Sequence, residues 1–239
     1  MGNIFKRYEK KYLVTREQGC ALQEHFLQHM EADQYGSYLV QNLYFDTENW
    51  DAIRESVAKP VYKEKMRLRC YGLPKQGTDF FLELKKKYKG IVYKRRIAIP
   101  AVSLTDKTVR DAVSAQPSQI ARELEFYMKS NAVSEKVYIA YHRIALAGAE
   151  DEGLRVTFDT DICFRTDCLD FRHPYVGVPI LPRNNMLMEI KTLGGMPMWM
   201  TRILSENKIY PAAFSKYGAC YTDHILGQSE ITRMVRYSA

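Results

Sequence analysis

Apolar and polar residues alternate along eight segments of the chain, and each segment is rich in aromatic or β-branched residues and bounded by turn residues. Alternation with a period of two places successive side chains on opposite faces of an extended backbone. Each segment is therefore predicted to be a β-strand. The predicted strands are Phe5–Val14, Val40–Asp46, Tyr62–Tyr71, Asp79–Tyr88, Ile91–Ile99, Val137–Ala145, Leu154–Phe164 and Met186–Thr192.

Four further segments carry helix signals. The first begins with a capping-box pattern, Thr15-Arg16-Glu17-Gln18, and has apolar Leu22, Phe26 and Met30 at four-residue spacing. The other three predicted helices begin at Pro117-Ser118, span Pro197–Lys208, and span Phe214–Leu226 with Ser215 as N-cap.

The order of these elements predicts the fold class. The connections between several strands are short, with Lys89-Gly90 as a hairpin signal, which favours antiparallel pairing. A sheet of eight strands tends to curl or close on itself. Because no linker or repeat interrupts the pattern, we expect one domain over residues 1–239. The expected fold is α+β: a closed eight-stranded antiparallel β tunnel with peripheral helices.

One face of nearly every predicted strand is charged, and the charge is mostly positive. Residues i and i+2 of a strand share a face, so Lys65 lies on the same face as Arg67. A face in contact with water is the ordinary explanation for any single strand, but such faces usually mix signs and carry neutral polar residues. Because these faces carry mostly Lys and Arg, we expect them to point into one shared interior of the sheet. The residues predicted to share this interior are Arg7, Glu9, Lys11, Lys63, Lys65, Arg67, Arg69, Glu83, Lys85, Lys87, Lys94, Arg96, Arg143, Arg155, Asp159, Glu189 and Lys191.

Composition narrows the partners. The net charge of +7 favours an anion, whether nucleic acid, phospholipid or phosphate. Nucleic acid prefers an open groove with repeated aromatic pairs, so we expect none as partner. No apolar run reaches the roughly 18 residues that cross a membrane, and no signal peptide is present, so we expect no direct membrane insertion. Five cysteines without a CxxC pair predict reduced thiols in a cytoplasmic protein.

The mixture of many cations with a few carboxylates suits a metal-complexed phosphate polyanion. Arginine offers forked donors to phosphate oxygens, and lysine offers a compact charge. Carboxylates cannot bind an anion, so we expect them to hold Mg²⁺ or Mn²⁺, which bridges phosphate oxygens. The usual glycine-rich phosphate loops and the HExxH and GxSxG motifs are absent from the sequence.

The order of eight short motifs resembles the VTC-domain polyphosphate polymerases of the triphosphate tunnel metalloenzyme (CYTH-like) superfamily. The resemblance covers nearly the whole chain. The motifs, in chain order, are Arg7-Tyr8-Glu9-Lys10-Lys11-Tyr12, Tyr44-Phe45-Asp46-Thr47, Arg67-Leu68-Arg69-Cys70-Tyr71-Gly72, Phe81-Leu82-Glu83-Leu84-Lys85, Tyr141-His142-Arg143, Arg155-Val156-Thr157-Phe158-Asp159-Thr160, Leu187-Met188-Glu189-Ile190-Lys191 and Phe214-Ser215-Lys216-Tyr217.

The resemblance implies extension of a polyphosphate chain inside the tunnel by the terminal phosphate of ATP, with Mn²⁺ or Mg²⁺. It implies that Glu189 holds the metal, that Glu9 and Glu83 orient basic side chains or support the metal, and that Asp159 is a further candidate. The implied catalytic clamps are Lys11, Arg67, Arg69, Lys85, Arg155 and Lys216. The implied phosphate-binding residues are Arg7, Lys65, Lys87, Lys94, Arg96, Arg143, Lys191 and Ser215.

The chain departs from the fungal members of the family. Lys87 occupies a position where the fungal enzymes carry histidine, and the chain resembles a stand-alone prokaryotic member. Three functions stay open: a polyphosphate polymerase acting on ATP and polyphosphate, a metal-dependent tri- or polyphosphatase, and a non-catalytic polyanion-binding module. Whether a neighbouring membrane protein receives the polymer also stays open.

Overall fold

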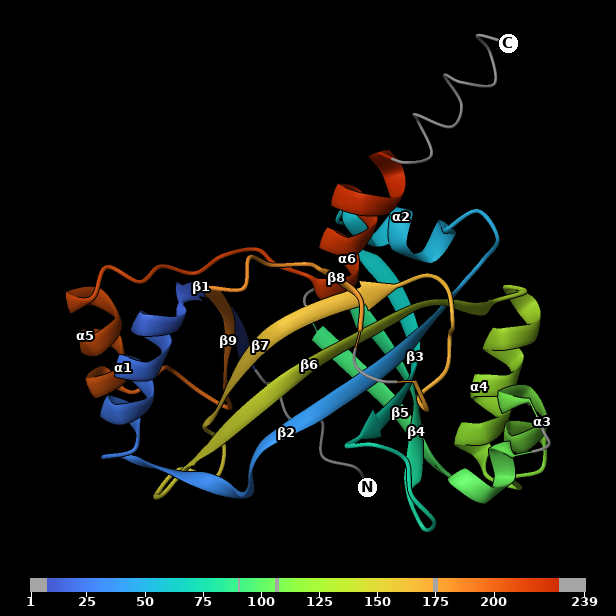
Figure 1. Cartoon of the computed structure of the whole chain (residues 1–239), viewed down its shortest axis with the longest axis horizontal. Helices are drawn as coiled ribbons and strands as arrows, with labels where there is room; N and C mark the ends of the chain where they lie inside the picture. Colours follow the sequence, from blue (N-terminus) through green and yellow to red (C-terminus); the bar gives the residue numbers. More distant parts are fainter. Residues whose placement is uncertain (1–7, 90, 106–107, 174–175, 228–239) are drawn as a thin grey trace, which may run out of the picture. The chain divides into compact units, whose positions relative to one another are not determined.

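The computed structural model describes residues 8–89, 91–105, 108–173 and 176–227 (Figure 1). Its described residues form two compact units. Unit 1 comprises those of Met1–Val40, Ala140–Cys163 and Leu181–Phe214, and unit 2 those of Gln41–Ile139, Phe164–Ile180 and Ser215–Ala239. Each unit has its own packed interior, and each is described by itself below. The assignment of residues 1–239 to one domain stays a prediction.

In the described part of the chain, nine strands form one hydrogen-bonded sheet in the order β1-β9-β7-β6-β2-β3-β4-β5, with β8 beside β7. The pairs β1–β9, β7–β9, β3–β4 and β4–β5 are antiparallel. The strands are β1 Tyr8–Thr15, β2 Met30–Asp46, β3 Tyr62–Tyr71, β4 Asp79–Tyr88, β5 Ile91–Pro100, β6 Ser134–Gly148, β7 Arg155–Arg165, β8 Val178–Pro179 and β9 Asn185–Thr192. Within the described residues this order does not return to its start, so closure into a tunnel stays a prediction.

Six α-helices among the described residues accompany the sheet. They are α1 Arg16–Phe26, α2 Asp51–Val57, α3 Val109–Ser114, α4 Gln119–Ser130, α5 Met198–Glu206 and α6 Lys216–Cys220. A short 3₁₀ helix covers Ala101–Leu104, and a π-helical stretch, Tyr221–Leu226, follows α6. Over the part of the chain that the structure describes, no helix is long and apolar enough to span a bilayer.

In unit 1 one sheet face is apolar and packs against α1 and α5 (Figure 1). Phe26 of α1 is fully buried, and its ring lies edge-on to Trp199 of α5 with centroids 5.6 Å apart. Phe158 and Met188 come from β7 and β9 and are paired directly in the register. Because alternate residues face opposite ways, this packing directs the charged residues of β1, β7 and β9 to the other face.

In unit 2 the apolar face of β3, β4 and β5 is covered by helices. Leu68, Leu82 and Ile97 lie side by side across the three strands and are buried. Helix α4 lies against β5, where Arg95 Nε donates to Glu123 Oε2 at 2.8 Å. The residues that alternate with these point away from α4 and form the cationic face described below.

Most predicted elements agree with the structure, and β3 and β4 have the predicted bounds. Helix α1 begins after the predicted capping box, in which Gln18 N donates to Thr15 Oγ1 at 3.1 Å. The predicted last helix is a five-residue α-helix continued as π-helix. All five cysteines are free, as predicted. The Lys89-Gly90 hairpin connects β4 and β5 through the pair Tyr88 and Ile91, although Gly90 lies outside the described residues.

Three differences between the predicted and the observed elements have physical causes. Strand β2 begins at Met30, ten residues before the predicted start, because its first part is largely exposed and lacks apolar alternation. Met30 therefore belongs to a strand and not to the helix face of α1. Helices α2 and α3 were not predicted, since both are shorter than two full turns and carry too few apolar positions to show a helical period.

Candidate functional site

The cationic face of unit 2 consists of side chains from β3, β4 and β5 in lateral rows. Arg67, Glu83 and Arg96 are direct cross-strand partners and form one row. The next row joins Lys65, Lys85 and Lys94 in the same way. The full face comprises Lys63, Lys65, Arg67, Arg69, Glu83, Lys85, Lys87, Lys94 and Arg96. A single carboxylate therefore shares this face with eight cationic side chains.

Glu83 is the buried counter-ion of this face, with only 2% of its surface exposed. Its Oε2 accepts from Arg67 Nε at 2.9 Å, and its Oε1 lies 2.5 Å from Lys94 Nζ and 3.5 Å from Arg96 Nε. Burial alone would raise the pKa of Glu83, but the charges of Arg67, Arg69 and Lys94 lower it to about 2. Glu83 is therefore ionised at neutral pH and orients three cations.

In the Glu83–Lys94 contact, the surroundings favour the charged form of Glu83 but disfavour the charged form of Lys94. The pKa of Glu83 is lowered, which favours its charge, whereas burial lowers the pKa of Lys94 and so disfavours the ammonium. Arg67 and Arg69 add to the lowering at Lys94. We attribute the difference to the excess of cations: one carboxylate cannot compensate all of them, so the face retains a positive potential.

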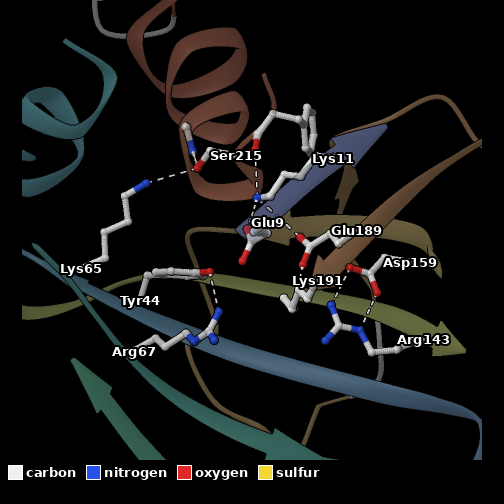
Figure 2. A network of polar contacts seen from close by, with 12 residues as sticks. Glu9, Lys11, Tyr44, Lys65, Arg67, Arg143, Asp159, Glu189, Lys191 and Ser215 are labelled. Carbon is white, nitrogen blue, oxygen red and sulfur yellow. Dashed lines mark hydrogen bonds and ion pairs between the residues drawn. The ribbon is translucent and has the colours of Figure 1, made fainter. Parts of the chain in front are cut away.

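Neighbouring polar groups hold the two arginines of β3 in place. Arg69 is 7% exposed, and its Nε donates to Asn42 Oδ1 at 2.9 Å. Arg67 NH1 donates to the Tyr44 hydroxyl at 3.3 Å (Figure 2). Arg96 lies over the Phe81 ring, 3.7 Å from its centroid. Fixed guanidinium groups lose little freedom when they bind an anion, which suits them to phosphate.

The start of α6 lies beside this face within unit 2. Ser215 is the N-cap: its Oγ accepts from Gly218 N at 3.1 Å and from Lys65 Nζ at 3.2 Å (Figure 2). Lys216 follows and is 8% exposed. A buried lysine next to the capping serine adds positive charge where the first backbone N–H groups of the helix are exposed.

Asp46 joins α2 to α6 and was not among the predicted site residues. Its carboxylate accepts from Ala52 N at 2.9 Å and Ile53 N at 3.0 Å, at the start of α2, and from the Tyr217 hydroxyl at 2.8 Å. Trp50, before α2, has a left-handed backbone with φ of 63° and no side-chain cap. Asp46 supplies the missing cap and fixes the residue that follows Lys216. Its place at the end of a strand, in the Tyr44-Phe45-Asp46-Thr47 motif, was the available signal.

In unit 1 a network of charges crosses β1 and β9. Lys11 is the direct partner of Glu189, and Glu9 is the direct partner of Lys191. Lys11 Nζ lies 3.4 Å from Glu189 Oε1 and 3.6 Å from Glu9 Oε1, and it donates to the Phe214 carbonyl at 3.0 Å. Lys191 Nζ lies 3.3 Å from Glu189 Oε2. Figure 2 shows Lys11 between the two carboxylates.

Arg143 and Asp159 form a second ion pair in unit 1. Asp159 is fully buried, and its two oxygens accept from Arg143 Nε at 2.6 Å and NH2 at 2.8 Å (Figure 2). Burial would lower the pKa of Arg143, but Asp159 holds it well above its ordinary value. Both carboxylate oxygens of Asp159 are occupied by this forked contact, which makes Asp159 an orienting group for Arg143.

Of the four predicted metal carboxylates, Glu9 and Glu189 both contact Lys11, Asp159 pairs with Arg143, and Glu83 belongs to unit 2, so their joint role at one metal stays a prediction. Within the residues that the structure describes, no three His, Cys, Asp or Glu side chains lie close enough together to hold a metal ion.

Glu189 nevertheless fits a hard cation. Its register neighbour Thr157 is 1% exposed, and among the described residues its Oγ1 has no hydrogen-bond partner. Mg²⁺ and Mn²⁺ are commonly bound by one or two carboxylates, with substrate phosphates and water supplying the other ligands. A pair of carboxylates with an unsatisfied hydroxyl beside it meets that requirement.

The remaining predicted residues lie as follows. Arg155 is exposed and is the direct partner of Lys191, which brings it to the charged face of unit 1. Lys85 and Lys87 are exposed on the cationic face of unit 2. Lys86, between them, faces the other way and contacts Glu64 at 3.0 Å. Arg7 lies outside the described residues.

These faces define an antiparallel β protein with a strongly cationic sheet face. Residues 6–223 match the VTC domain family, and the chain therefore belongs to that family. A search of curated proteins found no match.

The solved structures to which the chain is similar include the following three. The PH1819 protein from Pyrococcus horikoshii OT3 is 13% identical, with 94% of this chain and 99% of that chain covered and a TM-score of 0.48. A putative adenylate cyclase from Vibrio parahaemolyticus is 9% identical, with 93% and 100% covered and a TM-score of 0.49. The Mimivirus capping enzyme triphosphatase is 10% identical, with 84% and 87% covered and a TM-score of 0.33. All three scores are below 0.5, so the family assignment rests on the VTC match.

Proposed function

We propose that this protein is a polyphosphate polymerase that transfers the terminal phosphate of ATP to a growing polyphosphate chain. The observation that carries the proposal is the cationic face of unit 2, where eight cations share one buried carboxylate, Glu83. Such an excess of positive charge on rigid strands suits a ligand with many negative charges in a row. Membership of the VTC domain family supports a phosphate chain as that ligand.

The reaction asks little covalent chemistry of the protein. A terminal oxygen of the polyphosphate chain attacks the γ-phosphorus of ATP, the bond from that phosphorus to the β–γ bridging oxygen breaks, and ADP leaves with the electron pair. Catalysis then requires positioning and neutralisation of the charge on the transferred group. Arg67 and Arg69, held by Glu83 and Asn42, are suited to bind phosphate oxygens.

The other four predicted catalytic residues also have the role of binding phosphate charges in this proposal. We assign Lys85 and Lys216 to phosphate charges, because each contributes an ammonium group to unit 2. We assign Lys11 and Arg155 to the same task in unit 1, where Lys11 already bridges two carboxylates. The closed tunnel predicted from the sequence, in which these residues act on one polyphosphate chain, is part of this proposal. So is a cytoplasmic location, where ATP is available.

Glu189, with Glu9, is the part of the chain that we propose to hold Mn²⁺ or Mg²⁺. When bound, the divalent ion would neutralise phosphate oxygens and lower the repulsion between donor and acceptor. Lys11 contacts both carboxylates and would shift its contact toward phosphate when the metal takes its place. The Arg143–Asp159 pair keeps a guanidinium oriented on the same unit.

The test is incubation of the protein with ATP and Mn²⁺, followed by gel electrophoresis with a polyphosphate stain and measurement of ADP. A ladder of long polymers with matching ADP release is expected. Release of inorganic phosphate without polymer would replace the proposal by a tri- or polyphosphatase. Binding of polyphosphate without turnover of ATP would replace it by a non-catalytic polyanion-binding module.

A further inference from the structure

A separate pocket of about 80 Å³ lies within unit 2, between α2, β3 and α4. It is on the opposite side of β3 from the cationic face, because Glu64 alternates with Lys63 and Lys65 along the strand. Glu64 contacts Lys86, which also faces away from the cationic face of unit 2. The pocket is therefore not part of the site proposed above.

The lining of this pocket is acidic, although the protein carries a net charge of +7. Over the described residues the lining contains three carboxylates, Asp51, Glu55 and Glu64, and no basic residue. Asp51 Oδ2 accepts from Thr47 Oγ1 at 2.6 Å, and Glu64 accepts from the Tyr62 hydroxyl. Lys86 Nζ also lies 3.0 Å from Glu64 Oε1, and Arg54 NH1 lies 3.8 Å from Asp51 Oδ1, so among the described lining residues Glu55 is the carboxylate that no ion pair compensates.

Tyr127 of α4 is the second observation that points to a ligand. Only 6% of its surface is exposed, yet it lines the pocket. Among the residues that the structure describes, its hydroxyl makes no hydrogen bond, and this oxygen is not one of the fully buried unpaired atoms, so it is open to a ligand that enters the pocket. Burial raises the pKa of Tyr127, and the charges of Glu64 and Asp46 raise it further. The phenol therefore stays neutral, and its oxygen can accept a hydrogen bond from a cation.

We propose that this pocket binds a primary ammonium group carried on a short alkyl chain. An ammonium has three donors, which match the phenol oxygen of Tyr127 and the carboxylates of Glu55 and Glu64. The rings of Tyr62 and Tyr127 favour a cation above their faces. Ala52 and Val133 supply an apolar wall for the methylene groups.

The lining and the size of the pocket exclude two other classes of cation, divalent metals and large aromatic cations. A divalent metal requires several oxygen ligands around one point, and within the described part of the chain no three acidic, His or Cys side chains are arranged in that way. The pocket is also too small for a large aromatic cation. A free alkylamine and a lysine side chain of another protein segment share the required chemistry.

Titration with n-butylammonium, followed by backbone amide shifts of α2 and α4 in NMR spectra, tests the proposal. Nucleotide, polyphosphate and divalent metal are left out, because polyphosphate itself binds amines. We expect saturable shifts, with affinity reduced about tenfold in Tyr127→Phe, which keeps the ring and removes the hydroxyl. Glu55→Gln, on the exposed side of α2, should weaken binding in the same direction without disturbing the core.

Glu48→Gln is the matched control, because Glu48 is exposed near α2 but does not line the pocket. It should bind n-butylammonium as the wild type does. No saturable shift in the wild type, or equal affinity in Tyr127→Phe, Glu55→Gln and the control, would overturn the proposal. Binding of Nα-acetyl-lysine amide as well as butylammonium supports a protein lysine as the source, and binding of butylammonium alone supports a free amine.

Discussion

Lys65 and Lys85 are direct cross-strand partners in the β3–β4 pair, although both side chains are cationic. Lys85 is also the direct partner of Lys94 on its other side. Like charges in directly opposed positions destabilise a sheet. The cationic face therefore lowers the stability of the unliganded protein, and a bound polyanion would relieve the repulsion.

Lys85→Met is expected to have opposite effects on the free and the bound protein. Without ligand it should raise the free energy of unfolding by about 0.5 kcal/mol, because the repulsive pairs of Lys85 with Lys65 and with Lys94 are removed. With inorganic tripolyphosphate, the increase in Tm should be smaller than in the wild type. Differential scanning fluorimetry with and without tripolyphosphate measures both effects. A variant that is less stable without ligand and responds fully to tripolyphosphate would contradict this role of Lys85.

Lys85→Ala and Lys86→Ala provide a test of side-chain direction, because the two lysines are neighbours on opposite faces. Lys86 contacts Glu64 at 3.0 Å and lies away from the cationic face. We expect kcat/KM for ATP to fall at least about tenfold in Lys85→Ala, since an ammonium that neutralises phosphate is lost. Lys86→Ala should change it less than about twofold. Equal losses in steady-state ADP release would exclude the proposed division between the faces.

The pH dependence of stability should report on Glu83. Its folded-state pKa of about 2 is lower than the ordinary value of 4.5, so its contribution is complete above pH 4.5 and is lost as the pH falls toward 2. Glu83→Gln should lower the free energy of unfolding by about 2 kcal/mol at pH 7. Urea unfolding of both proteins at pH 7 and pH 2.5 gives the comparison. The difference in the free energy of unfolding between the wild type and Glu83→Gln should be smaller at pH 2.5 than at pH 7. The same difference at both pH values would show that the ion pairs of Glu83 contribute nothing to stability.

The strands and faces of this protein could be predicted because they follow from local alternation. In β3 the cations Lys65 and Arg67 alternate with buried Met66 and Leu68, and the sheet needs that apolar face to pack against helices. The first part of β2 could not be predicted in this way. It is mostly exposed on both sides, so no hydrophobic pattern distinguishes it from a loop.

The division of roles among the carboxylates depends on pairing that the sequence does not contain. Glu83, Asp159 and Glu189 all follow the same alternation, yet each has different partners in the structure. Arg143 occupies both oxygens of Asp159, whereas Glu189 meets two lysines. Which strands lie side by side decides this, and strand order is a long-range property. Asp46 was missed for the same reason, since its partner Tyr217 is distant in sequence.

The Arg143–Asp159 pair should show the energetics of a buried ion pair. Asp159→Asn leaves a buried guanidinium without its counter-ion and should lower the free energy of unfolding by about 3 kcal/mol. The double variant Arg143→Met, Asp159→Asn should recover part of this loss, because no charge then remains buried. Urea denaturation of the wild type, both single variants and the double variant completes the cycle. Additive losses in the double variant would show that the two residues are not coupled.

Glu189→Gln should remove the metal dependence of turnover while leaving the fold intact. The substitution keeps the size of the side chain but removes the charge that would hold Mn²⁺, and we expect kcat to fall roughly a hundredfold at saturating ATP. Half-saturation by Mn²⁺ should also move to higher concentration. Asp161→Asn is the control: Asp161 is a carboxylate of the same unit that pairs with Arg16 and has no part in the proposed site. Steady-state ADP release over a Mn²⁺ titration, with circular dichroism to verify folding, separates the outcomes. Wild-type turnover and an unchanged Mn²⁺ titration in Glu189→Gln would rule out this residue as the metal ligand.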